Sequence, residues 1–152
     1  MYKQTILFRS PLLIQSGYSG WARQLVNSIV DSPLYNEFDL YLWNVNWGDC
    51  PFIDDDHSFI LKHKKLIDKH KLTEHPDIFI TMGLPKEFEK IGKYTVGITA
   101  ACETDRISHQ WIEKINNCCD VLFAISNWTA QMIKGTFYQQ KHLQNGPILN
   151  KV

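Results

Sequence analysis

Short apolar runs alternate with longer amphipathic runs along most of this 152-residue chain. The apolar runs have the length of strands, and the amphipathic runs repeat apolar side chains at the three- and four-residue spacing of a helix. Alternating strands and helices favour a parallel sheet joined by right-handed crossovers, which is an α/β fold. The predicted strands are residues 6–8, 38–43, 78–82, 94–100 and 121–125.

The third and fifth predicted strands are continuous apolar runs, as expected where helices cover both faces of a parallel sheet. We therefore predict a Rossmann-like doubly wound sheet in the order 3-2-1-4-5. One domain is expected over residues 1–138, with residues 139–152 as a tail or the start of a linker. The predicted helices start at Trp21, carry Phe59 to Ile67, span 86–91, carry Trp111 to Cys119, and follow Ser126.

A glycine-containing segment, Ser16-Gly17-Tyr18-Ser19-Gly20, lies between the first predicted strand and the amphipathic run that starts at Trp21. A helix N-terminus carries unpaired N–H groups and a partial positive charge, and glycine lets a ligand approach the backbone closely. Together these features favour an anion site, commonly for a phosphate. The alternative is that the strand-to-helix turn needs glycine for its geometry alone, since the segment lacks the full G-x-G-x-x-G spacing.

Ligands of a doubly wound sheet bind beyond the carboxyl ends of the strands, where the strand order reverses. In the order 3-2-1-4-5 this point lies between strands one and four, so the glycine-containing segment would meet the polar loop after strand four. In that loop Glu103 is a candidate to orient a hydroxyl or act as a base, and Thr104 lies next to it. The alternative for Glu103 is a carboxylate that stabilises a helix start.

Polar or aromatic residues also follow two other predicted strands. Ser126 and Asn127 come after strand five and are candidates for the same cleft, although both residue types are also preferred helix N-caps. Trp47 comes after strand two, where it would either stack on a ligand or pack within its own loop.

Composition argues against several classes of protein. Lys+Arg and Asp+Glu number 16 each, so a net charge of zero gives no global electrostatic case for nucleic-acid binding. The chain shows no signal-peptide pattern and no apolar run of membrane-spanning length, from which we expect no transmembrane segment and a cytoplasmic location. We expect no metal and no cofactor, because no zinc-ligand spacing occurs. The cysteines, which form no C-x-x-C pair, are expected to be small buried side chains in a reducing compartment: Cys50, Cys102, Cys118 and Cys119.

Three stretches resemble the opening domain of family-4-type glycosyltransferases of the GT-B fold. They are ILFRSPLLIQSGYSGWARQL, DIFITMGLP and YTVGITAACETDRISHQWIEKINNCCDVLFAISNWT, and together they span roughly residues 5 to 138. The resemblance implies two Rossmann-like domains facing each other, of which this chain is the N-terminal, acceptor-side one. It also implies transfer of a sugar from a nucleotide-sugar donor to a hydroxyl acceptor without a metal.

The resemblance also implies roles for particular residues. Gly17 and Gly20, with Tyr18 and Ser19 between them, match the first loop, which lies near the donor phosphate and the acceptor. Glu103 and Thr104 match a cleft loop, with Glu103 as the candidate catalytic residue. Ser126, followed by Asn127, matches the serine that ends a strand before a helix.

The chain departs from the family in lacking the donor-binding domain. Catalysis would therefore depend on a donor-binding domain or partner chain. A non-catalytic interaction domain or remnant that pairs with a separate chain is the first alternative. A nucleotide-dependent oxidoreductase is the second, but it needs an acid near the end of strand two, where Trp43 and Asn44 stand.

Overall fold

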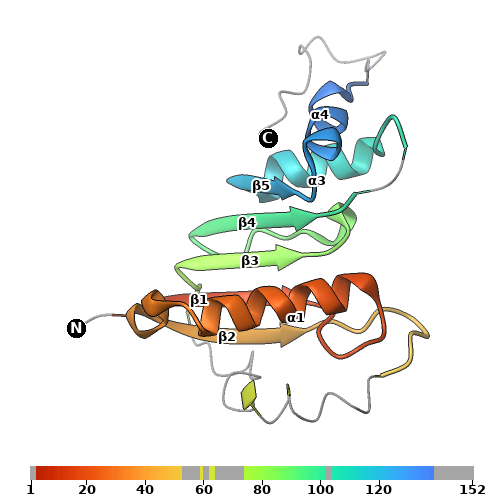
Figure 1. Ribbon diagram of the computed structural model, residues 1–152. Helices are drawn as coiled ribbons and strands as arrows, with labels where there is room; N and C mark the ends of the chain where they lie inside the picture. Colours follow the sequence, from red (N-terminus) through yellow and green to blue (C-terminus); the bar gives the residue numbers. More distant parts are fainter. Residues whose placement is uncertain (1–2, 53–58, 60–61, 64–73, 102–103, 139–152) are drawn as a thin grey trace. The chain divides into compact units, whose positions relative to one another are not determined.

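The computed structural model describes residues 3–52, 59, 62–63, 74–101 and 104–138. Its strands form a five-stranded sheet in the order β2-β1-β3-β4-β5 (Figure 1). The registers of β1 with β2, β1 with β3, and β4 with β5 are all parallel. The α/β prediction is therefore confirmed. The strands are β1 (Gln4–Ser10), β2 (Phe38–Asn44), β3 (Ile78–Met82), β4 (Tyr94–Thr99) and β5 (Val121–Ala124).

The predicted strand order 3-2-1-4-5 is wrong, because β3 pairs with β1 and not with β2. Ile6 of β1 lies opposite Leu40 of β2 on one side and Ile78 of β3 on the other. The burial of the two strands explains this choice. β1 is buried from Ile6 to Phe8, which suits a central strand, whereas β2 places the exposed Asp39 between partly and fully buried neighbours, which suits an edge.

Contacts divide the chain into two compact units. Unit 1 comprises Met1–Met82 and Ile91–Tyr94, and unit 2 comprises Gly83–Lys90 and Thr95–Val152. Each unit has its own buried residues. The helices of unit 1 include α1 (Gly17–Val30) and the 3-10 helix η1 (Pro33–Glu37), and those of unit 2 are η4 (Pro85–Glu87), α3 (His109–Cys118) and α4 (Asn127–Gly135).

In unit 1, helix α1 begins at Gly17, four residues before the predicted start at Trp21. The reason is a side-chain cap: Ser16 has an extended backbone, and its hydroxyl oxygen accepts the Ser19 N–H at 3.1 Å. The predicted glycine loop is therefore the first turn of the helix. Ala22 and Val26 of α1 are fully buried, and the strands contribute Phe8, Leu42 and Phe79 to the core of this unit.

Of the helix predicted to carry Phe59 to Ile67, only Phe59, Lys62 and His63 are described, and they are helical. His63 is 1% exposed, and its Nε2 lies 3.0 Å from the Asn27 side-chain oxygen of α1. The Phe59 ring packs edge-on against the imidazole, with centroids 4.6 Å apart. Burial lowers the pKa of His63, and the nearby Lys62 lowers it further, while Asp31 opposes the shift.

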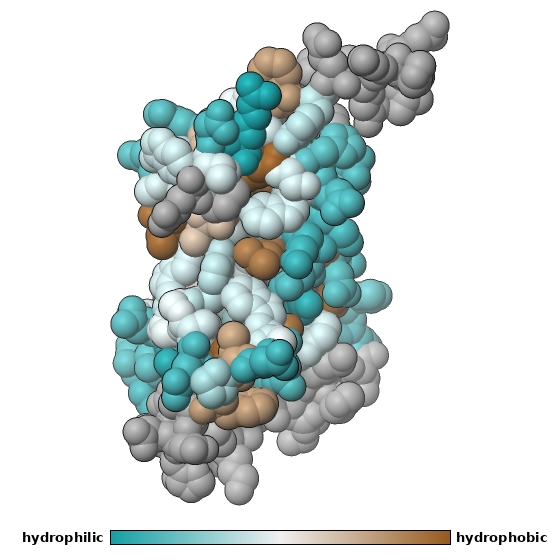
Figure 2. Space-filling model, turned by 90° about the vertical axis from the view of Figure 1, so that its right-hand side faces the viewer, coloured by the Kyte–Doolittle hydropathy of each residue, from teal (hydrophilic) through white to brown (hydrophobic). Residues whose placement is uncertain are grey.

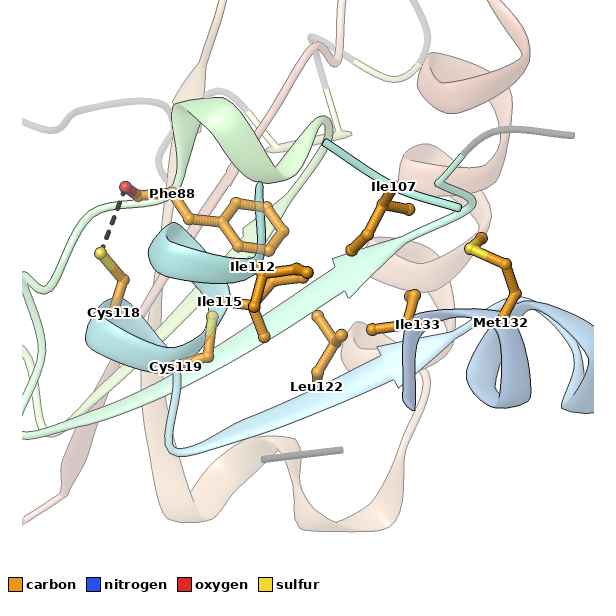
Figure 3. Packing of buried hydrophobic residues seen from close by; sticks show 9 residues of the cluster. All are labelled: Phe88, Ile107, Ile112, Ile115, Cys118, Cys119, Leu122, Met132 and Ile133. Atoms are coloured by element: carbon orange, nitrogen blue, oxygen red, sulfur yellow. Dashed lines mark hydrogen bonds between the residues drawn. The ribbon is translucent and has the colours of Figure 1, made fainter. Parts of the chain in front are cut away.

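In unit 2, one apolar cluster joins α3, α4, β5 and the residues after η4 (Figure 3). Its members are Phe88, Ile107, Ile112, Ile115, Cys118, Cys119, Leu122, Met132 and Ile133. Gly97 of β4 lies against this cluster, because a Cβ there would stand 2.7 Å from Cys119 Sγ and 2.8 Å from the Phe88 ring. The helix predicted over 86–91 is instead the short 3-10 helix η4, since Pro85 starts a turn that ends at Glu87.

The prediction that helices cover both faces of the fifth strand is wrong for the described residues. In β5, Leu122 is 5% exposed within the cluster, but the next residue, Phe123, is 57% exposed. Neighbouring strand residues point to opposite faces, so one face of β5 is packed and the other is open. Ile125, directly after the strand, is also 57% exposed.

The cysteine prediction is confirmed at two positions and wrong at one. Cys118 and Cys119 are buried free thiols, whereas Cys50 is exposed and Cys102 lies outside the described residues. Burial raises the pKa of Cys119 to about 12, so this thiol stays protonated and behaves as a small apolar group. Cys118 Sγ donates to the Phe88 carbonyl at 3.4 Å, which ties α3 to the segment after η4 (Figure 3).

Candidate functional site

The observed strand order moves the point at which ligands of this fold class bind. In the order 2-1-3-4-5 the strand order reverses between β1 and β3, not between β1 and β4. β3 therefore lies between the two strands whose loops were predicted to converge. The strand order therefore gives no reason to expect residues 16–20 and Glu103 in one cleft. In this order the expected ligand position is at the carboxyl ends of β1, β2 and β3 in unit 1.

At those carboxyl ends, Arg9 of β1 joins its two neighbouring strands. Its guanidinium carbon lies 4.9 Å from the centre of the Trp43 ring of β2, a cation–π geometry. One guanidinium nitrogen donates to the Thr81 hydroxyl of β3 at 3.4 Å. Both neighbours stand directly opposite Arg9 in the strand register. A half-buried cation is thus held over an aromatic ring at the reversal point of the sheet.

The segment after β1 is fixed by polar side chains from two elements. The Asn44 side-chain oxygen accepts the N–H groups of Leu12 at 2.8 Å and Leu13 at 3.1 Å. The Leu12 carbonyl in turn accepts the Ser19 hydroxyl and an Arg23 N–H, both at 2.9 Å. Ser10, fully buried at the end of β1, has a hydroxyl that makes no hydrogen bond to the described part of the chain.

The glycines of the first turn of α1 have open space around them. A Cβ added at Gly17 or at Gly20 would meet no atom within 4 Å, and neither residue has the positive φ that favours glycine. Turn geometry and internal packing therefore do not explain these glycines. Glycine lowers helix stability relative to alanine, so two of them in one helical turn are unfavourable for folding alone.

Aromatic side chains flank this turn. The rings of Tyr18 and Trp47 pack edge-to-face with centroids 5.1 Å apart, and Tyr18 also lies 6.2 Å from the Trp21 ring. Trp47 thus packs against Tyr18 of α1, and its stacking on a ligand stays a prediction. Ser19 differs from its neighbours: it is fully buried, and its hydroxyl is occupied by Leu12 and Arg23, so it supports the turn from within.

Three predicted site residues of unit 2 are described: two lie at the start of α4, and one lies in the loop after β4. Ser126 is the N-cap of α4, since its hydroxyl oxygen accepts the Thr129 N–H at 3.1 Å, as the capping alternative predicted. Asn127 is exposed at the first position of that helix. The exposed Thr104 donates its hydroxyl to the Arg106 carbonyl at 2.6 Å, and Glu103 lies outside the described residues. Their roles stay predictions.

The backbone is strained at Ala101, two residues after the end of β4. Ala101 has a φ of +55°, the left-handed region that residues with a Cβ rarely adopt. Its N–H donates to the Thr99 hydroxyl at 3.0 Å, which holds this conformation at the strand end. Strained residues cluster near functional segments, so the loop after β4 keeps its interest independently of the strand order.

The sequence prediction missed Arg9, Trp43 and Thr81 as a group. Each one is the next-to-last residue of its strand. The signal was an arginine that directly follows the apolar run Ile6-Leu7-Phe8. A charged residue at such a position is rarely buried without a partner. Only the strand pairing shows that these three side chains are neighbours.

Three further findings describe the molecule around this site. No helix among the described residues is long and apolar enough to cross a membrane. In the same part of the chain, no group of three or more His, Cys, Asp or Glu side chains is placed to hold a metal ion. Figure 2 looks from the right-hand side of Figure 1, the side toward which β2 and β3 of unit 1 point, and shows hydrophilic and intermediate residues with separate hydrophobic ones among them.

Comparison with protein-family models, with curated proteins and with solved structures gives no significant match to this chain. The assignment of a function therefore depends on the residues and geometry described above.

Proposed function

We propose that this chain is a glycosyltransferase-like domain, the acceptor-side half of an enzyme that transfers a sugar from a nucleotide-sugar donor to a hydroxyl acceptor. The chain would need a donor-binding domain, in the same or a partner chain, to be active. The observation that carries the proposal is the open pair Gly17 and Gly20 in the first turn of α1. The resemblance of the three sequence stretches to the family agrees with it.

The surroundings of this turn suit such a ligand. The N-terminal end of α1 favours a negative charge, such as a diphosphate, and glycines leave its backbone accessible. Tyr18 and Trp47 offer aromatic surface for the apolar side of a sugar ring. Arg9 supplies a fixed positive charge at the end of β1. Glu103 remains the proposed base, on its sequence position alone.

The experiment separates ligand binding from folding stability by glycine replacement. Gly20→Ala should raise the free energy of unfolding by up to about 1 kcal/mol, because alanine has a higher helix propensity than glycine has. It should also lower the affinity for UDP-glucose or GDP-mannose at least about tenfold, a loss of about 1.4 kcal/mol in binding. Intrinsic tryptophan fluorescence follows binding, and urea unfolding follows stability. The Gly17→Ala variant should weaken binding in the same way.

Gly135 provides a matched control, since it is a helical glycine of α4 with equally open surroundings. Gly135→Ala should leave nucleotide-sugar binding unchanged. We expect no measurable transfer by these 152 residues alone, because stabilisation of the leaving group, often the largest catalytic term, would come from a donor-binding domain. If Gly17→Ala and Gly20→Ala bind as tightly as the unchanged protein, the proposal fails.

A non-catalytic domain that pairs with a separate chain is the second candidate. The exposed Phe123 and Ile125 favour it, since hydrophobic side chains that stand together on a surface often mark an interface. Under this alternative, nucleotide sugars show no saturable binding to the unchanged protein. The oxidoreductase alternative lacks support, because Asn44 ends β2 and its side-chain oxygen is occupied by Leu12 and Leu13.

A further inference from the structure

Unit 1 contains a cavity of about 240 Å³ along the first half of β2. β2 has seven residues, and Trp43 and Asn44 stand at its other end. The lining reaches Tyr41, two residues before Trp43, so the cavity lies beside the candidate site along β2 and shares no residue with it. The residues that line it include Lys3, Tyr35, Asn36, Phe38, Asp39 and Tyr41.

Local structure explains why these residues meet. Ser32 caps η1, accepting the Leu34 N–H at 3.2 Å, and the short helix leads directly into β2. Tyr35 is thereby placed beside Phe38, with the rings edge-to-face at 5.8 Å. Lys3 precedes Gln4, which pairs with Phe38, so the start of β1 lies alongside. Because β2 is at the edge of the sheet, the cavity opens at a sheet border.

The chemistry of the lining selects a class of ligand. The Lys3 ammonium and the Asp39 carboxylate lie 3.9 Å apart and offset each other's charge, so the residues that line the cavity carry no net charge. The phenols of Tyr35 and Tyr41 and the amide of Asn36 donate and accept hydrogen bonds. The rings of Tyr35 and Phe38, packed edge-to-face, supply apolar surface. The volume lies below the roughly 300 to 1,000 Å³ of sites for drug-sized molecules.

We propose that this cavity binds a small, neutral, hydroxyl-rich ring of monosaccharide size. The hydroxyls of such a ring would exchange hydrogen bonds with Asn36 and Tyr41, while its C–H groups would pack on the aromatic rings. The inference does not rest on the proposed function, because it uses no residue of the candidate site.

The test is a titration of the whole chain, labelled with ¹⁵N, with glucose, galactose and myo-inositol. We expect saturable shifts of amide signals from residues 35–41, with a dissociation constant of about 1 mM, typical of a weak site of few contacts. Asn36→Ala and Tyr41→Phe should each weaken binding about threefold to tenfold, because each removes one hydrogen-bonding group. Tyr94→Phe is the control, since Tyr94 is exposed outside the cavity.

Other outcomes overturn the inference. Shifts confined to residues 17–20 and 43–47 would place the ligand at the candidate site. That result would support the proposed function and overturn the inference about the cavity. Equal or tighter binding of serine or of inorganic phosphate would show that the cavity selects charge. Unchanged affinity in both Asn36→Ala and Tyr41→Phe, with their spectra showing an intact fold, would exclude these side chains from binding.

Discussion

Asp77 and Thr5 join the amino ends of β3 and β1 by a reciprocal set of hydrogen bonds. One carboxylate oxygen of Asp77 accepts the Thr5 N–H at 2.9 Å and the Thr5 hydroxyl at 3.2 Å, and the Asp77 N–H donates back to that hydroxyl at 3.1 Å. In unit 2, Asp120 accepts the Thr95 N–H at 2.7 Å. An aspartate that directly precedes a strand thus receives an N–H of the neighbouring strand in both units.

Replacement of Asp77 by alanine should destabilise the protein by about 2 kcal/mol, because it leaves the Thr5 donors without their charged acceptor. Urea unfolding measures this change. Lys93 also contacts Asp77, at 2.6 Å, but its side chain is 65% exposed. Lys93→Met should therefore cost less than about 1 kcal/mol, as is usual for an exposed ion pair. Equal losses in the two variants would show that the ion pair, and not the strand clamp, stabilises this end of the sheet.

Stability should fall as the pH is lowered through the range in which an unfolded histidine gains its proton. Burial lowers the pKa of His63 below the 6.5 that is usual for histidine, so the folded state binds this proton less readily than the unfolded state. The contribution of neutral His63 is fully present above pH 6.5 and is lost as the pH falls from there toward the lowered pKa. Unfolding in urea at several pH values measures this dependence.

His63→Gln is the variant that isolates this effect. Glutamine does not titrate and keeps a group able to bond Asn27, so the decline below about pH 6.5 should become shallower. Lys62 and Asp31 form a 3.7 Å ion pair nearby, which this variant leaves unchanged. His75→Gln, at an exposed position, is the control. An unchanged pH profile in His63→Gln would assign the acid sensitivity to other groups.

Glycine at position 101 should stabilise the protein by about 0.5 to 1 kcal/mol, because the φ of +55° at Ala101 costs less without a Cβ. Gly48→Ala, at a residue whose φ is +48°, should destabilise the protein by about 1 kcal/mol. A Cβ at Gly48 would meet no atom within 4 Å, so only backbone strain acts there. Thermal unfolding of both variants tests the pair, and a loss of stability in Ala101→Gly would contradict the strain at this residue.

Gly97→Ala should destabilise unit 2 by about 1 to 3 kcal/mol through overpacking. Its Cβ would stand within 2.9 Å of Leu122 Cδ1 and closer still to Cys119 Sγ and the Phe88 ring. Replacing Cys119 by alanine in the same chain should recover part of the loss, because it removes the nearest of these atoms. Denaturant unfolding of the single and double variants measures the coupling, and strictly additive losses would contradict a direct contact.

Much of the local structure follows from local patterns. The third strand was predicted with its observed bounds, Ile78–Met82, and the fifth differs by one residue, because both are short apolar runs with clear ends. Ser126 as a helix cap was also open to prediction, since capping depends on a few adjacent residues. The start of α1 was misplaced for a related reason: Ser16 was read as part of a loop rather than as the cap of Gly17–Val30.

The sequence by itself determined the alternation of strands and helices, hence the α/β class, because periodicity and capping act over a few residues. Only the tertiary structure decided that β1 lies between β2 and β3, since strand pairing depends on which surfaces are buried together over long separations. That choice moved the candidate site from between the loops after strands one and four to the ends of β1, β2 and β3. It also placed Arg9, Trp43 and Thr81 side by side, although the sequence separates Arg9 from Thr81 by 72 positions.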